Sequence, residues 1–496
     1  MRSRLIASDS QTNFFKRVFL KEKLNNTTGY VIVTVLAIAF SYALAYNLIV
    51  GLTVFAAVIG IFVLTACLVS PEVGFYLNVF FVFSASTLSR FFLDQVPLGI
   101  GSDLIVLTSF VGLFFSKRNL RKAAGHFFRI PPVVLYSIIL VYLTCELFNP
   151  LAHSFDGWLQ VMRKIVGPFL IVFIVYNAFD NLAKIKIFIK ILFVLALIAG
   201  AYGCFQQWHG LTTAEMNWVN SDPLRSQLIN IFGEYRKFSV FNGPTEFGII
   251  MAGCTVFFIL ISLEEENRRT KVLYIAGAIF MLLGMSYSGT RTANAMLTGG
   301  AIVFSALTIN KKATRIFVFI AFMIFLFAMY APIYSSAALL RFRSTFSSGE
   351  DASYAVRETN RKFVQPFIWS HPFGGGLSTT GAMGMKYNAG HPMAGFPTDS
   401  SYLNKALESG WVGLILTCAL YFLILRFVVK SYFQAENKQF KSLFAALLGF
   451  FFATFLGEMT QETVGVFANT FVYFPLLGIA FKLKELSDQE LGKASS

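Results

Sequence analysis

Two arginines lie where charged side chains are unusual, beside long hydrophobic stretches. Arg236 precedes such a stretch by a few residues, and Arg291 lies between two of them with almost no loop. An arginine this close to hydrocarbon is costly unless it is paired, lines a wet cavity or reaches the lipid headgroups. Guanidinium groups offer paired donors that match phosphate oxygens, and they keep their charge. Arg236 and Arg291 are therefore candidates for binding a lipid-linked diphosphate.

Arg357 and Arg361 are further candidates for the same diphosphate, with Arg361 the weaker. They are four residues apart in the segment YAVRETNRKFVQPFIWS, so a helix there would place both on one face. Phe363, Phe367 and Trp369 would seat that helix on the membrane interface.

For each arginine the alternative is a structural ion pair or a side chain that reaches the headgroups. The acidic residues nearby in sequence are Glu234, Glu246, Glu350, Asp351 and Glu358.

Two residues are candidates for a general base. Asp399 directly precedes a predicted helix, so it is a candidate N-cap, a base, or both. His391 lies in the glycine- and proline-rich GHPMAGFP, and an ordinary histidine pKa near 6.5 suits proton transfer. A structural role for His391 competes with that hypothesis. His371 precedes Pro372 and is interpreted as structural, while the glycines at 374–376 indicate either a turn or a close approach to a ligand.

The sequence predicts neither a metal nor a cofactor. No group of His, Cys and carboxylate residues has metal-ligand spacing, and no phosphate-binding or dinucleotide-binding motif occurs. The five cysteines show no paired spacing and are expected to be buried small hydrophobes.

Composition predicts the elements that position these residues. The chain has 496 residues, of which 56% are hydrophobic and 14% are charged. Soluble domains carry about 25% charged residues, so the deficit indicates an integral membrane protein. The net charge of +15 does not indicate nucleic acid, because the basic residues occur in short clusters between apolar stretches.

Apolar stretches of about 20 residues predict an all-α, polytopic bundle of about 12–14 transmembrane helices. We expect spans near 29–50, 52–69, 73–89, 100–116, 131–148, 161–177, 185–206, 244–263, 272–288, 293–309, 315–333, 411–429, 442–459 and 465–482.

The basic clusters predict orientation, because they fall on one side when the spans alternate. Residues 1–28 and 483–496 are then cytoplasmic tails, and 29–333 holds the first eleven spans with an outer loop at 207–243. Residues 334–410 form a large, helical loop outside the cytoplasm, and the last three spans occupy 411–482.

Three stretches together resemble the superfamily of bacterial O-antigen ligases and polysaccharide polymerases. They are Arg236 with Phe241-Asn242-Gly243-Pro244, the turn SGTRTA at 288–293, and the outer loop with HPFGGG at 371–376 and DSSYL at 399–403. Ser239 stands where the family pattern has glycine, and Gly243 interrupts its Asn-Pro pair. Ligases of the family carry a catalytic histidine at the position of Asp399, which favours the polymerase branch.

The resemblance implies an inverting, metal-independent glycosyltransferase of the bacterial inner membrane, with the large loop in the periplasm. The donor would be a glycan on undecaprenyl diphosphate, and the acceptor a sugar hydroxyl of a second glycan. Arg236, Arg291, Arg357 and Arg361 would bind the departing diphosphate, with Arg291 catalytic, and Asp399 or His391 would accept the proton. Exopolysaccharide or O-antigen polymerisation is the leading hypothesis, and ligation to lipid A-core is the alternative.

Two other classes stay open. A flippase for lipid-linked oligosaccharides would have a similar number of spans, although no internal repeat is seen and the charges gather at the outer edge. A scaffold that binds lipids and other envelope-assembly proteins is the second.

Overall fold

The computed structural model describes residues 25–91, 98–116, 120–231, 233–310, 312–332, 343, 352–398 and 400–494. The chain divides into two compact units, residues 1–66 and 67–496. The first unit holds α2 (Thr27–Tyr46) and most of α3 (Leu48–Val69), with Asn47 alone between them. The side chain of Asn26 begins α2 by accepting a hydrogen bond from the amide of Gly29 at 2.7 Å.

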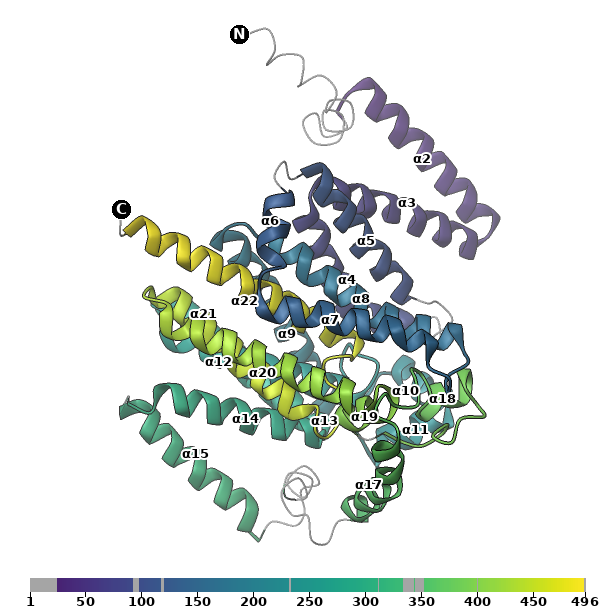
Figure 1. Cartoon of the computed structure of the whole chain (residues 1–496). Coiled ribbons are helices and arrows are strands. Elements are labelled where there is room, and N and C mark those ends of the chain that lie inside the picture. Colours follow the sequence, from purple (N-terminus) through teal and green to yellow (C-terminus); the bar gives the residue numbers. More distant parts are fainter. Residues whose placement is uncertain are drawn as a thin grey trace. The chain divides into compact units, whose positions relative to one another are not determined.

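The second unit is a bundle of long helices (Figure 1). These are α4 (Pro71–Phe91), α5 (Leu98–Ser116), α7 (Pro131–Cys145), α8 (Phe155–Ala178), α9 (Leu182–His209), α12 (Pro244–Glu264), α13 (Arg268–Ser288), α14 (Arg291–Thr308), α15 (Lys312–Tyr330), α20 (Gly410–Gln434), α21 (Lys438–Gly457) and α22 (Phe467–Ala494). Two short helices, α6 (Leu120–Phe127) and η2 (Glu146–Phe148), flank α7. Each predicted span coincides with one long helix of the two units.

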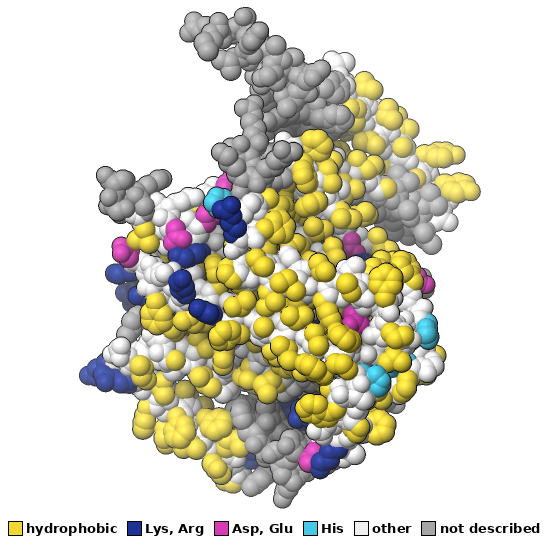
Figure 2. All heavy atoms as spheres, in the orientation of Figure 1, with side chains coloured by type: hydrophobic (Ala, Val, Ile, Leu, Met, Phe, Trp, Pro, Cys, Tyr) yellow, Lys and Arg dark blue, Asp and Glu magenta, His cyan; other side chains and the backbone are white. Residues whose placement is uncertain are grey.

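Seven of the described helices are long and apolar enough to cross a membrane. The chain is therefore an all-α, multi-pass membrane protein, as predicted. The centre of the bundle is formed by α12 and α21. In their apolar 18-residue stretches, 89% and 83% of the residues are buried. By contrast, only 22% of the residues in the apolar stretch of α20 are buried, so this helix lies at the surface of the bundle. Figure 2 shows hydrophobic side chains covering the middle of one face, with Lys and Arg gathered near the end of α22.

The segments between the spans contain further helices, of which all but α17 (Ala352–Ser370) are short. The short ones are α10 (Thr213–Asn220), α11 (Pro223–Ile229), α18 (Gly381–Tyr387) and α19 (Ser401–Glu408). A short hairpin, which the sequence did not predict, pairs two strands of two residues each, β1 (Asn230–Ile231) and β2 (Glu234–Tyr235). The described parts of the large loop contain the helices α17, α18 and α19, with turns and irregular segments between them.

The large loop docks onto the connection between α7 and α8. The hydroxyl of Ser378 donates to the carbonyl of Gly157 at 2.9 Å, and the amide of His153 donates to Oδ1 of Asn388 at 3.1 Å. One side of the bundle thus collects the loop with the ends of α7 and α8. At the opposite ends of the helices, Lys184 forms an ion pair with Glu72 at 3.1 Å.

Candidate functional site

Arg236 binds the turn that precedes Arg291. Its Nε donates to the carbonyl of Ser288 at 2.8 Å, and its Nη2 donates to Oγ1 of Thr290 at 3.1 Å. The backbone of the neighbouring Lys237 also donates to the carbonyl of Tyr287 at 3.2 Å. Two segments more than 50 residues apart in sequence are therefore held together on one side of the bundle.

The close packing of α12 fixes the conformation of this turn. Oγ1 of Thr290 donates to the carbonyl of Pro244 at 3.1 Å. A Cβ on Gly248 would lie 2.5 Å from Oγ of Ser288, so only glycine allows α12 to pack this closely. Gly289 ends α13 in the left-handed conformation, with φ of 60°. The turn is thus fixed by backbone geometry as well as by side-chain contacts.

Arg291 is half-buried and is the first residue of α14. The N-terminus of a helix carries unpaired amides and a partial positive charge, so Arg291 adds a full charge where anions are already favoured. The adjacent Thr292 shares a hydrogen bond with Thr460 at 2.8 Å. Arg291 is therefore placed beside the segment that connects α21 with α22.

The connection between α21 and α22, residues 458–466, joins the predicted motifs. The carboxylate of Glu458 is buried and accepts hydrogen bonds from Thr463, Val464 and Tyr421. Its backbone carbonyl accepts from Oγ of Ser400 and from the amide of Ser401, each at 3.2 Å. The start of α19 is therefore attached to the segment whose Thr460 contacts the start of α14.

Asp399, the leading candidate base, lies outside the described residues. Its predicted role as N-cap is wrong by one residue, because Ser400 occupies the N-cap position of α19. Ser400 makes no capping hydrogen bond with its own helix and binds the carbonyl of Glu458 instead. The contacts of Ser400 and Ser401 thus bring the residue after Asp399 to the connection that also contacts α14.

His391 has the contacts of a structural residue. Its Nδ1 accepts the amide of Met393 at 3.1 Å, and its ring meets the ring of Phe367 edge-on at 5.8 Å. Its Nε2 is buried, and a Cβ on Gly375 would lie 2.5 Å from it. Burial lowers the pKa of His391, and the nearby His371 lowers it further. These contacts favour a neutral, structural imidazole, while the base role of His391 stays a hypothesis.

The glycines at 374–376 form a turn that packs against the end of α19. Gly374 and Gly376 have φ of 77° and 89°, in the region that favours glycine. The amide of Gly375 donates to the carbonyl of Leu407 at 2.8 Å, and a Cβ on Gly374 would lie 2.4 Å from the nitrogen of Gly410. The close approach that the sequence suggested is therefore to the end of α19. His371 binds the carbonyl of Phe367 at 2.9 Å, as a structural residue would.

Arg357 and Arg361 lie on α17, which confirms the helix expected there. The side chain of Arg357 is not among those that the structure describes, and the side chain of Arg361 is exposed. Val364 of α17 packs with Leu407 and Met393, so this helix is attached to the loop rather than to the turn at 288–292. The diphosphate roles of Arg357 and Arg361 stay predictions.

Two of the acidic residues expected as ion-pair partners of the arginines, Glu358 and Glu246, make other contacts. Glu350 and Asp351 lie outside the described residues, and Glu358 pairs with Lys362 at 2.9 Å. Glu246 accepts the amides of Asn242 and Ala468 at 3.2 and 2.9 Å, which ties the start of α12 to the start of α22.

Arg90 organises the segment that carries Arg236, a role the sequence analysis missed. The buried guanidinium donates to the carbonyls of Ser239 and Phe241 and lies 3.7 Å from the carboxylate of Glu215. Gln206 supports the same segment, since its Oε1 accepts the amide of Ser239 at 2.8 Å. The one signal in the sequence was an arginine at the end of a span on the side that the basic clusters avoid.

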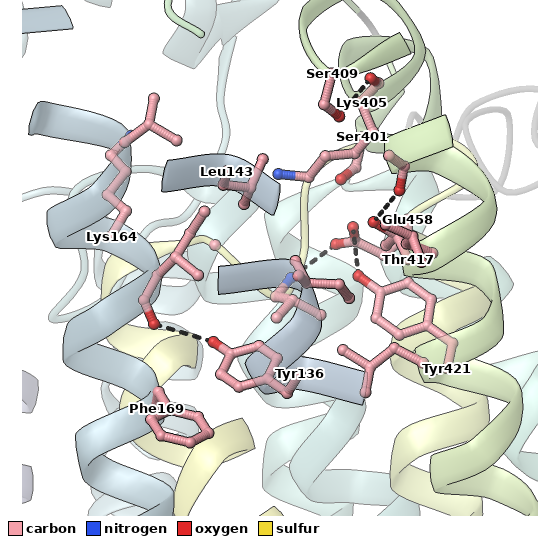
Figure 3. Close-up of a pocket in the computed structure, with 18 of the residues that line it drawn as sticks. Tyr136, Leu143, Lys164, Phe169, Ser401, Lys405, Ser409, Thr417, Tyr421 and Glu458 are labelled. Carbon is pink, nitrogen blue, oxygen red and sulfur yellow. Dashed lines mark hydrogen bonds between the residues drawn. The ribbon is translucent and has the colours of Figure 1, made fainter. Parts of the chain in front are cut away.

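A cavity of about 200 Å³ is lined in part by α19 and residues 458–465 (Figure 3). Its lining residues come from α7, α8, α18, α19, α20 and α22 and from the segments beside them. Neither Arg236 nor Arg291 lines it, and its polar residues were not predicted as site residues. They include Gln160, Lys164, Ser401, Asn404, Lys405, Glu408, Glu458 and Glu462, together with Ser378, Ser409 and Thr417.

These features define a multi-pass helical membrane protein in which two arginine-bearing segments meet beside a helical loop. Residues 276–418 match the family model described as O-antigen ligase. The match confirms the resemblance seen in the sequence, and it spans Arg291, α17 and the positions of His391 and Asp399. The family implies an envelope-glycan function of the ligase or polymerase type. The comparison with curated proteins gives no match.

Proposed function

We propose that this protein is a polysaccharide polymerase of the bacterial inner membrane. It transfers a glycan from undecaprenyl diphosphate to a sugar hydroxyl on a second glycan at the periplasmic face. The observation that carries the proposal is the guanidinium of Arg236 bound to Ser288 and Thr290, immediately before Arg291 at the start of α14. The family match supports the reaction class.

In the proposed reaction the acceptor hydroxyl attacks the anomeric carbon from the side opposite the diphosphate. A bond forms between that oxygen and the carbon, the bond from the carbon to the diphosphate oxygen breaks, and the configuration inverts. The departing diphosphate gains negative charge, which fixed cations stabilise without having to reorganise. Arg236 and Arg291 perform this task, and Asp399 accepts the hydroxyl proton.

The polymerase branch is preferred over lipid A-core ligation because Asp399 stands where the resemblance places the histidine of ligases. The two branches differ in their product. A polymerase gives a ladder of lengthened lipid-linked glycans, whereas a ligase gives single transfers to lipid A-core. Purified protein supplied with each acceptor distinguishes them, and a flippase would only move the lipid-linked glycan across a bilayer.

The test is glycan transfer by purified Arg236→Ala and Arg291→Ala variants in lipid vesicles. Each is expected to lose about 10²–10³ in rate, as when one preorganised charge-stabilising donor is removed. Arg236→Lys keeps the charge but not both contacts, so intermediate activity is expected. Arg268→Ala, at the opposite end of α13, is the matched control. Full activity in both alanine variants would refute the site, and chelation by EDTA should leave the rate unchanged.

A further inference from the structure

A second cavity, of about 450 Å³, lies between α5, α8 and the start of α22. Each of the three helices lines it with residues at helical spacing, such as Gly99, Asp103 and Leu107 on α5. Neither Arg236 nor Arg291 is among its lining residues. The proposed transfer reaction therefore leaves this cavity without a role.

The polar end of the second cavity carries two cations and one carboxylate. The guanidinium of Arg163 on α8 donates to Asp103 on α5 through both Nε and Nη2, and both contacts fall on Oδ2. Among the residues that the structure describes, Oδ1 of Asp103 and the amine of the adjacent Lys164 have no hydrogen-bond partner. Charged groups beside apolar spans are costly unless a partner engages them. This end of the cavity thus offers one free acceptor and one free cation to a ligand.

Pro168 adds a second free acceptor at the same cavity. Gly167 and Pro168 both line it, and Pro168 lies inside α8. Proline has no N–H, so the carbonyl of Lys164, four residues earlier, cannot receive its usual helical hydrogen bond. That carbonyl and the carboxylate of Asp103 are the acceptors that a ligand with N–H donors would need.

The apolar wall of the second cavity is about as deep as one leaflet of a bilayer. It includes Leu107, Leu170 and Phe471, which come from the three different helices. Arg163 lies in the first turn of the span predicted at 161–177, which places the charges at headgroup level. From Arg163 to Ile171 the helix rises about 12 Å, close to half of a hydrocarbon core about 30 Å thick. The wall therefore suits the acyl chain of a phospholipid better than the much longer chain of undecaprenol.

We propose that this cavity binds one zwitterionic phospholipid with a primary amine, of the phosphatidylethanolamine type. The phosphate meets Arg163 and Lys164, the ammonium donates to Asp103 and to the carbonyl of Lys164, and an acyl chain follows the apolar wall. Two cations and one carboxylate complement a phosphate and an ammonium. Phosphatidylglycerol has no cation for Asp103, and the trimethylammonium of phosphatidylcholine has no N–H to donate.

The lipid would stabilise a connection that reaches the arginines. Gly465 and Phe467, at the end of the connection 458–466 and the start of α22, line the second cavity. The same connection carries Thr460, which shares a hydrogen bond with Thr292 beside Arg291. The bound phospholipid is thus a structural component and not a substrate, and the inference does not depend on glycan transfer.

The experiment measures lipid binding to the delipidated, full-length protein by native mass spectrometry. Phosphatidylethanolamine, phosphatidylglycerol and phosphatidylcholine with the same acyl chains are the probes. We expect one site that prefers phosphatidylethanolamine about tenfold over the other two, the effect of one charge-assisted hydrogen bond. Lys164→Met should lower the affinity for phosphatidylethanolamine about tenfold, and Asp103→Asn should abolish the preference over phosphatidylglycerol. Lys190→Met, at a similar distance from the start of α9 and outside the cavity, is the control.

Gly167→Leu fills the cavity while keeping the helix. A Cβ on Gly167 would meet no heavy atom within 4 Å, and leucine favours a helix more than glycine does. This variant should lose the lipid site, whereas Gly167→Ala, which adds little bulk, should retain it. Added phosphatidylethanolamine should accordingly raise the thermal unfolding midpoint of the wild type and of Gly167→Ala, but not that of Gly167→Leu.

Two results would overturn the phospholipid site. One is equal binding of the three lipids by the wild type, and the other is wild-type binding of phosphatidylethanolamine by Gly167→Leu. Neither measurement involves glycan transfer, so failure of the proposed function would leave this inference standing.

Discussion

At the scale of single residues, the two base candidates differ in what surrounds them. The Nδ1 of His391 is occupied by the amide of Met393, and its Nε2 is buried. Asp399 immediately precedes Ser400, which is bound to the connection beside Arg291. A base must reach the proton that it removes. His391 meets this requirement only if the loop rearranges.

We therefore expect Asp399→Asn to abolish transfer and His391→Gln to retain most of it, measured as initial rates. His391→Gln should also change the pH dependence of stability. The folded pKa of His391 lies below its usual value, so the unfolded chain binds a proton first and wild-type stability falls as the pH drops through about 6.5. Thermal unfolding between pH 7.5 and 5.5 should show a flatter dependence in His391→Gln. Loss of transfer in His391→Gln alone would move the base to His391.

Ser239 combines an unusual backbone conformation with a buried hydrogen bond. Its φ is 51°, and its hydroxyl donates to the carbonyl of Ala199 at 2.6 Å. The family resemblance has glycine at this position, and the left-handed φ explains why glycine suits it. Serine is retained here with a compensating contact.

Ser239→Ala should lower the free energy of unfolding by about 1 kcal/mol, because the hydrogen bond is lost while the backbone conformation still disfavours a side chain. Ser239→Gly loses the same bond but relieves about 1–2 kcal/mol of left-handed backbone cost, so it should be more stable than Ser239→Ala. Thermal unfolding in detergent gives the order of the three proteins. A less stable glycine variant would contradict the backbone argument.

At the scale of elements, α4 supports the segment that carries Arg236. Arg90 lies in the last turn of α4, and its guanidinium lies 4.6 Å from the ring centre of Phe238 and 5.1 Å from that of Trp218. Together with Glu215, these contacts hold residues 238–241 against the end of the span. Arg90 thus acts on Arg236 through the backbone between them.

Arg90→Leu should lower stability by about 3–5 kcal/mol, since it leaves the buried carboxylate of Glu215 without its cation. Adding Glu215→Leu should cost less than the sum of the single changes, with a coupling of about 1–3 kcal/mol. Arg225→Leu is the control. It removes a guanidinium that lies 4.0 Å from the ring centre of Trp218, and it should cost under about 1 kcal/mol. Additive effects in the double variant would contradict the pairing.

Sequence patterns predicted the elements much better than the contacts between them. Apolar length predicted where the long helices lie, because a membrane imposes helices of about 20 residues, and seven of the described helices are long and apolar enough to cross one. Arg236 and Arg291 were predicted to bind one diphosphate from their position beside apolar spans, and they lie in segments that meet, while their role stays a prediction. The connection at 458–466 was missed, because Glu458 acts through its backbone carbonyl and buried hydrogen bonds, which no spacing reveals. The cavity beside α19 escaped prediction for a similar reason, since its lining comes from six helices.

At the scale of the whole molecule, the helix ends form two groups. Contacts such as that of Ser401 with Glu458 join the ends on the side predicted to be periplasmic. On the other side, Lys186 binds Gln439 at 2.9 Å and Asn437 binds Glu490 at 3.0 Å. The second group lies among the basic clusters, which cytoplasmic segments carry in excess. If that side is cytoplasmic, as predicted, both arginines and the cavity beside α19 lie at the periplasmic face.

Labelling of introduced cysteines tests this orientation. Lys386→Cys on α18 and Lys438→Cys at the start of α21 are both exposed and lie in the two different groups of helix ends. In spheroplasts, a membrane-impermeant maleimide should label position 386 and should label position 438 only after the cells are lysed. Cys145 and Cys418 are exposed, although the sequence predicted that the cysteines would be buried. Both are replaced by serine in the two variants so that the signal comes from the introduced thiol. Labelling of position 438 in intact spheroplasts would place the arginines on the cytoplasmic side, where a periplasmic polymerase could not use them.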